Sequence, residues 1–242
     1  MRNLILLFLL ISILPDIVSQ NLKTITVKTP SPVKTKEVFQ VIKDNPKIKN
    51  GNYKKYRSKK IIEVGFYKNN NKDSIWNIYN QNGKVIATGN YKENKKIGVW
   101  KFYSKTGILV QEYNFSIDSL TYFNVTEEKK WNSSPSIYPD TASDQMPIFI
   151  GGSGYMHTLI ENNLIYPTAA YKKLKKGNVY ISFTVEKDGS VTNVKSLKLA
   201  GYGFDEEGIR LVESFIEKWI PGKQKGKLVR VQYNLPIKFS IK

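Results

Sequence analysis

The chain has 242 residues, enough for one large domain or two small ones, and 40% of them are apolar, enough to form folded cores. It has no cysteine and a single histidine, His157, which excludes disulfides, thiolate metal sites and metal centres built from several histidines. The formal net charge is +18, so the composition suits a protein with anionic neighbours such as lipid head groups, cell-wall polymers or nucleic acid.

The N-terminus has the pattern of an export signal. Arg2 precedes an apolar stretch over residues 4–14, and Ser19 supplies a small residue at the expected cleavage point. We therefore expect residues 1–19 to be a cleaved signal peptide. The alternative is an uncleaved membrane anchor, but a spanning helix needs about 20 apolar residues, and this stretch is roughly half as long.

Residues 37–115 contain three copies of one pattern, at about 37–64, 65–88 and 89–115, after an N-terminal segment over residues 20–36. The last two copies agree at glycine and aromatic positions 24 residues apart: Gly65, Tyr67, Trp76, Tyr79 and Gly83 recur as Gly89, Tyr91, Trp100, Tyr103 and Gly107. In each copy short aromatic-rich runs flank a polar turn, which predicts a β-hairpin. The pattern resembles the bacterial variant of MORN repeats, and this resemblance implies an elongated antiparallel sheet used for contacts rather than chemistry.

The aromatic and lysine residues of the repeats have two interpretations. In the first, Trp76, Tyr79, Trp100 and Tyr103 are packing residues, and the lysines solvate the outer face. In the second, a basic face makes weak contact with an anionic envelope surface, because residues 20–130 hold 22 Lys and Arg against 9 Asp and Glu. Base stacking on these aromatics is not expected of an exported protein, so no nucleic-acid partner is predicted.

A change in composition separates the repeats from the rest of the chain. Residues 116–143 are rich in turn-forming residues and lack periodicity, which predicts a linker between two domains. The second domain, residues 144–242, begins with a helix over about 154–163, and a second short helix follows Pro167.

The remainder of the second domain combines strands with one more helix. Period-two alternation over 179–185, the Asp188-Gly189 turn and a return strand over about 190–199 predict a hairpin. A further helix, ending at Pro221-Gly222, is predicted by apolar residues that recur at helical spacing, namely Ile209, Val212, Phe215, Ile216 and Trp219. Alternation over 229–241 predicts one long strand, and Pro236, which has no N–H, requires part of it to lie at a sheet edge.

The predicted fold class is therefore a mainly β array of antiparallel hairpins followed by a small α+β domain, an antiparallel sheet with two to three helices. The ordered motifs of residues 145–242 resemble the TonB C-terminal domain: Tyr166, Pro167, Asp188, Gly189, Trp219, Pro221 and Gly222. Members of that family lie in the periplasm and bind the extended TonB box of outer-membrane transporters, which adds as a strand to the sheet edge.

The resemblance implies a TonB-like periplasmic binding or adaptor protein that engages an outer-membrane transporter or another envelope protein and supports transmembrane transport. A family transducer also has an N-terminal membrane helix coupled to an ExbB–ExbD-type motor, and a long Pro/Lys/Glu-rich spacer. This sequence has a short apolar segment and no such spacer. The motor is therefore implied only if the N-terminus stays uncleaved, which would anchor the chain in the inner membrane facing the periplasm. The alternative is an envelope scaffold that recognises its partner through the repeats, without energy coupling.

The expected partner-binding edge lies in the last strand, at Val229, Arg230, Val231, Gln232, Tyr233 and Asn234. The alternation predicts which side chains face the helices, namely Val229, Val231, Tyr233 and Leu235. It leaves three on the solvated face beside an incoming peptide, namely Arg230, Gln232 and Asn234.

The sequence predicts neither catalysis nor a cofactor or metal. His157 is expected to be structural, and Asp205-Glu206-Glu207 suits the start of a helix better than acid–base chemistry. Residues 151–154, Gly-Gly-Ser-Gly, superficially resemble a phosphate-binding loop, but neither a preceding strand nor a following Lys-Ser/Thr supports that assignment.

Overall fold

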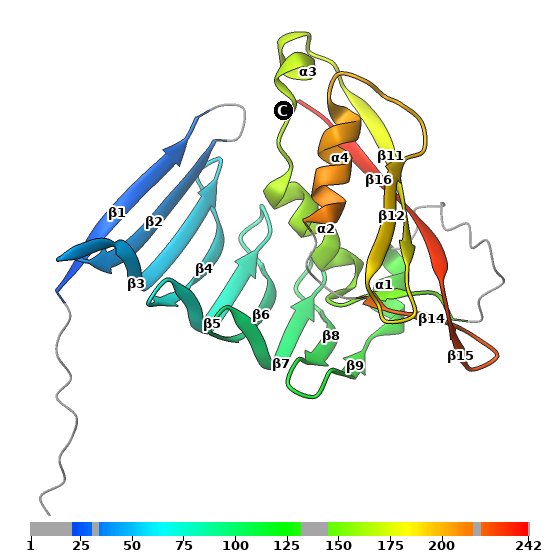
Figure 1. The fold of residues 1–242 in the computed structure, drawn as a ribbon, viewed down its shortest axis with the longest axis horizontal. Helices are drawn as coiled ribbons and strands as arrows, with labels where there is room; N and C mark the ends of the chain where they lie inside the picture. Colours follow the sequence, from blue (N-terminus) through cyan, green and yellow to red (C-terminus); the bar gives the residue numbers. More distant parts are fainter. Residues whose placement is uncertain (1–20, 31–33, 132–144, 215–218, 242) are drawn as a thin grey trace, which may run out of the picture.

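The structure is a computed structural model that describes residues 21–30, 34–131, 145–214 and 219–241. A long antiparallel sheet forms one side of the molecule, and a smaller sheet covered by helices forms the other (Figure 1). The segment expected to be a signal peptide, residues 1–19, lies outside the described residues. Within the described ranges, no helix is long and apolar enough to cross a membrane.

The long sheet has nine strands that pair in chain order, each antiparallel to the next. They are β1 (Leu22–Thr29), β2 (Thr35–Ile42), β3 (Asn45–Arg57), β4 (Lys60–Lys68), β5 (Asn71–Tyr79), β6 (Val85–Lys92), β7 (Lys95–Tyr103), β8 (Leu109–Asn114) and β9 (Ser119–Phe123). Equivalent two-residue turns at Asn69-Asn70 and Glu93-Asn94 have both residues at positive φ, as type I′ hairpin turns require. The hairpin array is thus observed, and it extends beyond residues 37–115 at both ends.

Each of the last two repeats buries a tryptophan against a glycine. Trp76 and Trp100 are 0% exposed. A Cβ atom at Gly65 would lie 2.2 Å from the ring of Trp76, and one at Gly89 would lie 2.3 Å from the ring of Trp100. The repeated glycine is therefore a steric requirement of the tryptophan, which explains why the two residue types recur in phase.

Adding a methyl group at this contact gives the first test. We expect Gly89→Ala to lower the free energy of unfolding by about 1–3 kcal/mol, because the ring of Trp100 has to move from its packed position. The neighbouring Asn90→Ala is a matched control, since this side chain is exposed, and should change stability by less than about 0.5 kcal/mol. Urea unfolding of both variants measures the difference, and equal stabilities would contradict the steric account.

Lysines that recur with the repeat lie over aromatic rings of the long sheet. The Nζ of Lys49 is 4.5 Å from the ring centroid of Phe39, that of Lys72 is 4.0 Å from Trp76, and that of Lys96 is 4.5 Å from Trp100. Cation–π attraction of this kind stabilises partly desolvated contacts. The packing interpretation therefore holds for Trp76 and Trp100, whereas Tyr79 and Tyr103 are half-buried. The three lysines contribute to the packing.

The region expected to be a linker is partly ordered into two elements. Strand β9 and helix α1 (Val125–Trp131) both lie within residues 116–143. The Asn124 side chain accepts a hydrogen bond from the backbone N–H of Glu127, which caps the start of α1. The turn-rich residues that suggested a linker are concentrated after residue 131, and residues 132–144 lie outside the described part of the chain.

The C-terminal part contains three helices and a three-stranded antiparallel sheet. The helices are α2 (Gly152–Asn163), α3 (Thr168–Lys172) and α4 (Phe204–Glu213), and the sheet has the order β12 (Val191–Ser196), β11 (Gly177–Val185), β16 (Val231–Phe239). Two short pairs complete it: β10 (Ile148–Phe149) with β13 (Trp219–Ile220), and β14 (Gly222–Gln224) with β15 (Lys227–Val229). Helix α4 packs on β11 and β12, so one face of the sheet is buried.

Two predicted elements differ in this part. The long strand expected over 229–241 is divided, because β15 ends at Val229 and β16 begins at Val231. Trp219 was expected on a helix and lies in β13 instead. Its backbone N–H donates to the carbonyl of Gly189, and its ring packs between Phe149 and Tyr233, so long-range contacts override the helical spacing.

The two parts share a core and are not separated by the predicted linker. Helix α2 packs on β6 and β7, and the rings of Tyr155 and Phe102 lie 5.0 Å apart. Arg57 donates to the carbonyl of Asn162 at 2.9 Å, and the Asn162 side chain donates to the carbonyl of Tyr79 at 3.0 Å. One hydrophobic cluster runs from the repeat tryptophans through α2 to the small sheet.

Candidate functional site

Strand β16 is an edge strand of the small sheet. Among the described residues it pairs with β11 alone, in a continuous register from Gly177↔Phe239 to Val185↔Val231. The carbonyl of Tyr180 in β11 accepts a hydrogen bond from Leu197, on the β12 side. Because N–H and C=O of one residue point the same way in an antiparallel strand, Tyr180 exchanges no bond with its partner Pro236.

The Tyr180–Pro236 pair fixes the direction in which each backbone N–H and C=O of β16 points. Pro236 and the residues two apart from it, Gln232, Asn234 and Lys238, direct their backbone groups away from β11 and toward the open edge. Proline has no N–H, so its position at an outward phase leaves no sheet hydrogen bond broken. The edge therefore offers N–H donors at 232, 234 and 238, and carbonyl acceptors at these positions and at Pro236.

The side chains that alternate with these positions anchor β16 in the core. Val231, Tyr233 and Leu235 are buried, as expected, whereas Val229 is half-buried in β15. The Tyr233 ring lies 5.3 Å from the ring of Phe183. Burial, with a smaller contribution from the charge of Glu128, raises the pKa of Tyr233 to about 12, so its hydroxyl stays neutral at physiological pH.

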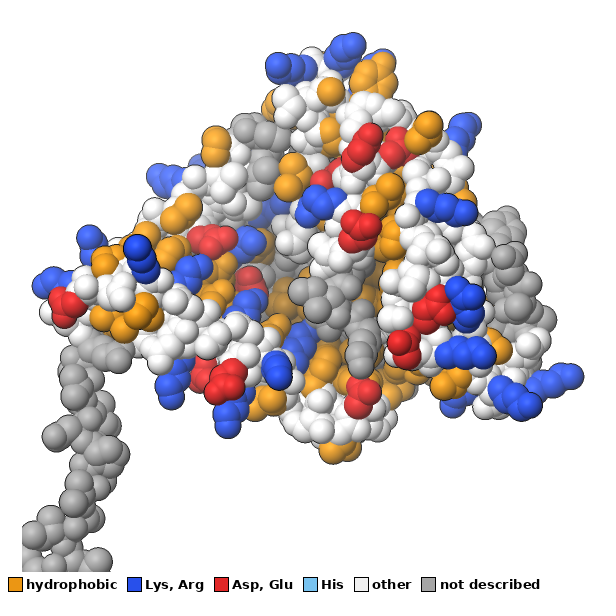
Figure 2. Space-filling view, in the orientation of Figure 1, with side chains coloured by type: hydrophobic (Ala, Val, Ile, Leu, Met, Phe, Trp, Pro, Cys, Tyr) orange, Lys and Arg blue, Asp and Glu red, His pale blue; other side chains and the backbone are white. Residues whose placement is uncertain are grey.

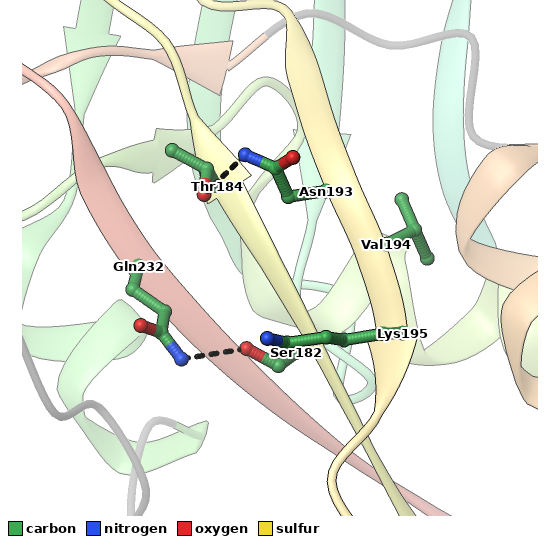
Figure 3. A pocket seen from close by; sticks show the side chains of 6 residues that line it. All are labelled: Ser182, Thr184, Asn193, Val194, Lys195 and Gln232. Carbon is green, nitrogen blue, oxygen red and sulfur yellow. Dashed lines mark hydrogen bonds between the residues drawn. The ribbon is translucent and has the colours of Figure 1, made fainter.

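The opposite face of the sheet is polar and is linked by side-chain bonds. Gln232 Nε2 donates to Ser182 Oγ at 2.8 Å, from β16 across to β11 (Figure 3). Arg230 forms an ion pair with Glu186, with Nε 2.7 Å from Oε2. Hydrogen bonds from Thr192 and Arg230 hold the pKa of Glu186 below its usual value. Both bonds lie on the polar face of the sheet, and they orient the start of β16.

A shallow depression of about 350 Å³ lies on this polar face, beside the β16 edge. Its lining comes from all three strands: Ser182, Thr184, Asn193, Val194, Lys195 and Gln232 (Figure 3). Asn234 departs from the expected pattern, because it is only 7% exposed rather than solvated. Its Oδ1 has no hydrogen-bond partner among the residues that the structure describes. The side chain of Asn234 is thus a buried part of the strand, and the backbone of that residue is what the edge offers.

The motif residues near the start of the domain support the sheet from its helical side. Tyr166 is buried against Phe204 and Phe239, and its hydroxyl donates to the carbonyl of Lys175. Pro167 is the residue that precedes α3. Tyr166 therefore supports the packing of the sheet, Pro167 marks the start of α3, and neither belongs to β16.

The glycines of the motif allow close backbone approach. Gly189, in the turn after Asp188, has φ +81°, and a Cβ there would lie 2.0 Å from the Trp219 carbonyl oxygen. A Cβ at Gly222, which follows Pro221, would lie 2.7 Å from Val231. The second contact brings the backbone at Gly222 close to Val231, the first residue of β16.

The N-terminus of α2, where the glycine-rich residues 151–154 lie, is occupied by a carboxylate of the chain itself. Glu128 accepts from the N–H of Ser153 through both of its carboxylate oxygens, at 3.0 and 3.1 Å. An anion at a helix N-terminus is favoured by the unpaired N–H groups and the helix dipole. Glu128, which belongs to α1, therefore accepts a hydrogen bond from the start of α2. The two residues lie 25 positions apart, so the sequence alone does not reveal this contact.

His157 makes stability depend on pH with a defined sign. Burial, with a contribution from Lys105, lowers its pKa below the ordinary 6.5. On acidification the unfolded chain binds the proton first, so stability present above pH 6.5 is lost as the pH falls toward the folded-state pKa. As the pH falls below 6.5, we expect the free energy of unfolding to decrease less in His157→Gln than in the wild type. Urea unfolding at several pH values measures this, and the same pH dependence in both proteins would contradict it.

The comparisons with known proteins address the C-terminal part. Residues 162–241 match the model of the family described as Gram-negative bacterial TonB protein C-terminal. No curated protein matches the chain. Among solved structures, the crystal structure of TarM is similar at 14% identity and a TM-score of 0.25, over 47% of this chain and 24% of that one. The resemblance to the TonB C-terminal domain is confirmed over residues 162–241, and these residues are a TonB C-terminal domain; the resemblance of residues 37–115 to MORN repeats stays a prediction.

Proposed function

We propose that the chain is a TonB-like adaptor of the bacterial envelope, located in the periplasm, that binds the TonB box of an outer-membrane transporter by strand addition to β16. The observation that carries this proposal is the outer edge of β16, which has no partner strand in the described part of the chain and directs the backbone groups of Gln232, Asn234 and Lys238 outward. Such an edge binds an extended peptide chiefly through main-chain hydrogen bonds. The TonB C-terminal domain supports an envelope role that is not enzymatic.

The edge also limits how a peptide would bind. Pro236 can accept but cannot donate, so the peptide pairs most fully with the half of β16 that precedes it. That half contains the expected binding residues 231–234, and the Arg230–Glu186 ion pair marks its start. A motor of the ExbB–ExbD type enters this proposal only if the N-terminus is retained as an anchor, which N-terminal sequencing of the mature protein would decide.

The test is calorimetric titration of a synthetic TonB-box peptide into the full chain. Two N-methylated versions provide matched controls, since they keep every side chain and block alternate backbone donors. We expect saturable binding of the unmodified peptide, loss of binding for the version methylated on the phase that faces β16, and retention for the other phase. Equal affinities for the two methylated peptides would rule out strand addition.

A second candidate function is recognition through the long sheet, as an envelope scaffold. The observation in its favour is the extent of the array, nine strands rather than the six that three hairpins require. This alternative predicts that photo-crosslinkers placed on exposed sheet positions such as Ile75 and Val99 capture the partner, whereas crosslinkers beside β16 do not. Strand addition predicts the reverse.

A further inference from the structure

One end of the molecule combines exposed lysines with exposed apolar side chains. It is formed by the end of α3 with the turn after it, residues 171–176, and by residues 198–202 of the loop between β12 and α4 (Figure 1). We name these two segments the lysine tip. Neither segment contains an acidic residue. All five lysines of the tip are exposed, namely Lys172, Lys173, Lys175, Lys176 and Lys198. In the space-filling view, basic and apolar side chains gather at this end (Figure 2).

Two leucines project from the tip. Leu174 is 70% exposed and Leu199 is 84% exposed. Leu174 has φ +51°, a left-handed conformation that leucine rarely adopts. Hydrogen bonds from Leu174 N–H to the Tyr171 carbonyl and from Lys175 N–H to the Ala170 carbonyl fix this turn. The fold thus turns a large apolar side chain toward solvent between pairs of lysines.

The two segments form one surface. The Nζ atoms of Lys173 and Lys175 lie 5.7 and 5.4 Å from the ring centroid of Tyr202, which belongs to the other segment. The nearby carboxylate of Asp205 is buried, and it accepts hydrogen bonds from the backbone N–H groups of Ala200 and Gly201 at 2.9 and 2.8 Å. Asp205 therefore orders the loop from inside and adds no carboxylate to the outer surface.

The combination distinguishes the tip from the rest of the basic surface. In the repeats, recurring lysines such as Lys72 and Lys96 cover buried tryptophans. At the tip, lysines alternate with leucines that cover nothing within the described chain. Lysines attract anionic head groups, and exposed leucine side chains gain free energy when they enter the boundary between head groups and acyl chains. An acidic protein surface would attract the lysines but would offer no apolar environment to the leucines.

We propose that the lysine tip is a contact site for an anionic lipid bilayer, with Leu174 and Leu199 entering the head-group region and the lysines beside the lipid phosphates. This goes beyond strand addition, because it uses other residues and another class of partner. A bilayer contact at this end would orient the domain at a membrane surface while the β16 edge binds its peptide.

The test is flotation of the full chain with phosphatidylglycerol vesicles, with phosphatidylcholine vesicles as the neutral comparison. Changing Lys172, Lys173, Lys175 and Lys176 together to glutamine should weaken partitioning by about fivefold for each lysine, and so by several hundredfold in all. The matched control changes four exposed repeat lysines to glutamine: Lys54, Lys68, Lys92 and Lys95. It removes the same charge and should weaken partitioning less than about tenfold, through long-range attraction alone.

A second variant tests the apolar contribution. Leu174→Asn with Leu199→Asn keeps the charge and suits the left-handed position, because asparagine tolerates positive φ. It should fold normally by circular dichroism, bind the TonB-box peptide with unchanged affinity, and retain a vesicle binding that added salt abolishes more readily than in the wild type. Equal losses for the tip and control lysine variants would overturn the proposal, as would absence of vesicle binding. If the tip lysine variant binds vesicles normally but no longer captures a solubilised transporter, the lysine tip contacts a protein instead of a bilayer, and the proposal is overturned.

Discussion

Trp100→Ala is expected to lower the free energy of unfolding by about 3–5 kcal/mol, the range for truncating a large buried aromatic residue. Trp100 is fully buried, its Nε1 donates to the carbonyl of Asn90 at 3.0 Å, and its ring contacts Phe102, which in turn contacts Tyr155 of α2. The loss therefore affects the junction between the long sheet and the TonB domain as well as the repeat.

The same variant tests whether the chain unfolds as one unit. Because the core is continuous, hydrogen exchange in β5 and in β11 should accelerate together in Trp100→Ala. Val99→Ala is the matched control: its side chain is 41% exposed on the adjacent position of β7, so stability should change by less than about 0.5 kcal/mol. Acceleration confined to the long sheet would mean that the TonB domain folds independently.

Gln232→Pro is expected to weaken peptide binding much more than it weakens the fold. The N–H of Gln232 points away from β11, in the same phase as Pro236, so proline at 232 breaks no bond of the sheet. An incoming peptide would lose that donor, and a main-chain acceptor left unsatisfied on docking costs about 1–3 kcal/mol, roughly a fivefold to hundredfold loss of affinity.

Gln232→Thr is the matched control for this substitution. Both changes remove the side-chain bond to Ser182, so any effect of that bond is shared. Threonine keeps the backbone N–H and favours extended structure, and it should bind the TonB-box peptide with nearly wild-type affinity in calorimetric titration. If the proline and threonine variants bind equally well, β16 is not the edge that takes the peptide.

Features that depend on local periodicity could be predicted from the sequence. The repeat could be recognised because a glycine such as Gly89 has to recur with a tryptophan such as Trp100 for the ring to pack. The hairpin at Asp188-Gly189 could be recognised because this residue pair strongly favours a two-residue turn. Pro236 indicated an edge strand by its missing donor alone. The strands that carry the candidate site were therefore predicted, and so was the burial of Val231, Tyr233 and Leu235.

Features that depend on contacts between distant residues could not be predicted in the same way. Trp219 follows helical spacing, but its backbone pairs with Gly189 and its ring with Phe149. Asn234 alternates with apolar residues, and the tertiary structure buries it nonetheless. Glu128 lies in what the composition indicated as a linker, and only the fold brings it to the α2 N-terminus. The shared core between the two parts arises from such contacts.

The most direct measurement is residue-resolved amide hydrogen exchange of β16, with and without the TonB-box peptide. In the free chain, the N–H groups of Val231 and Tyr233 should be protected by β11, and those of Gln232 and Asn234 should exchange quickly. At a peptide concentration of about 100 times Kd, strand addition predicts that exchange at Gln232 and Asn234 slows by about a hundredfold. Unchanged exchange at these two residues, with new protection in β12 or in the long sheet, would contradict the account.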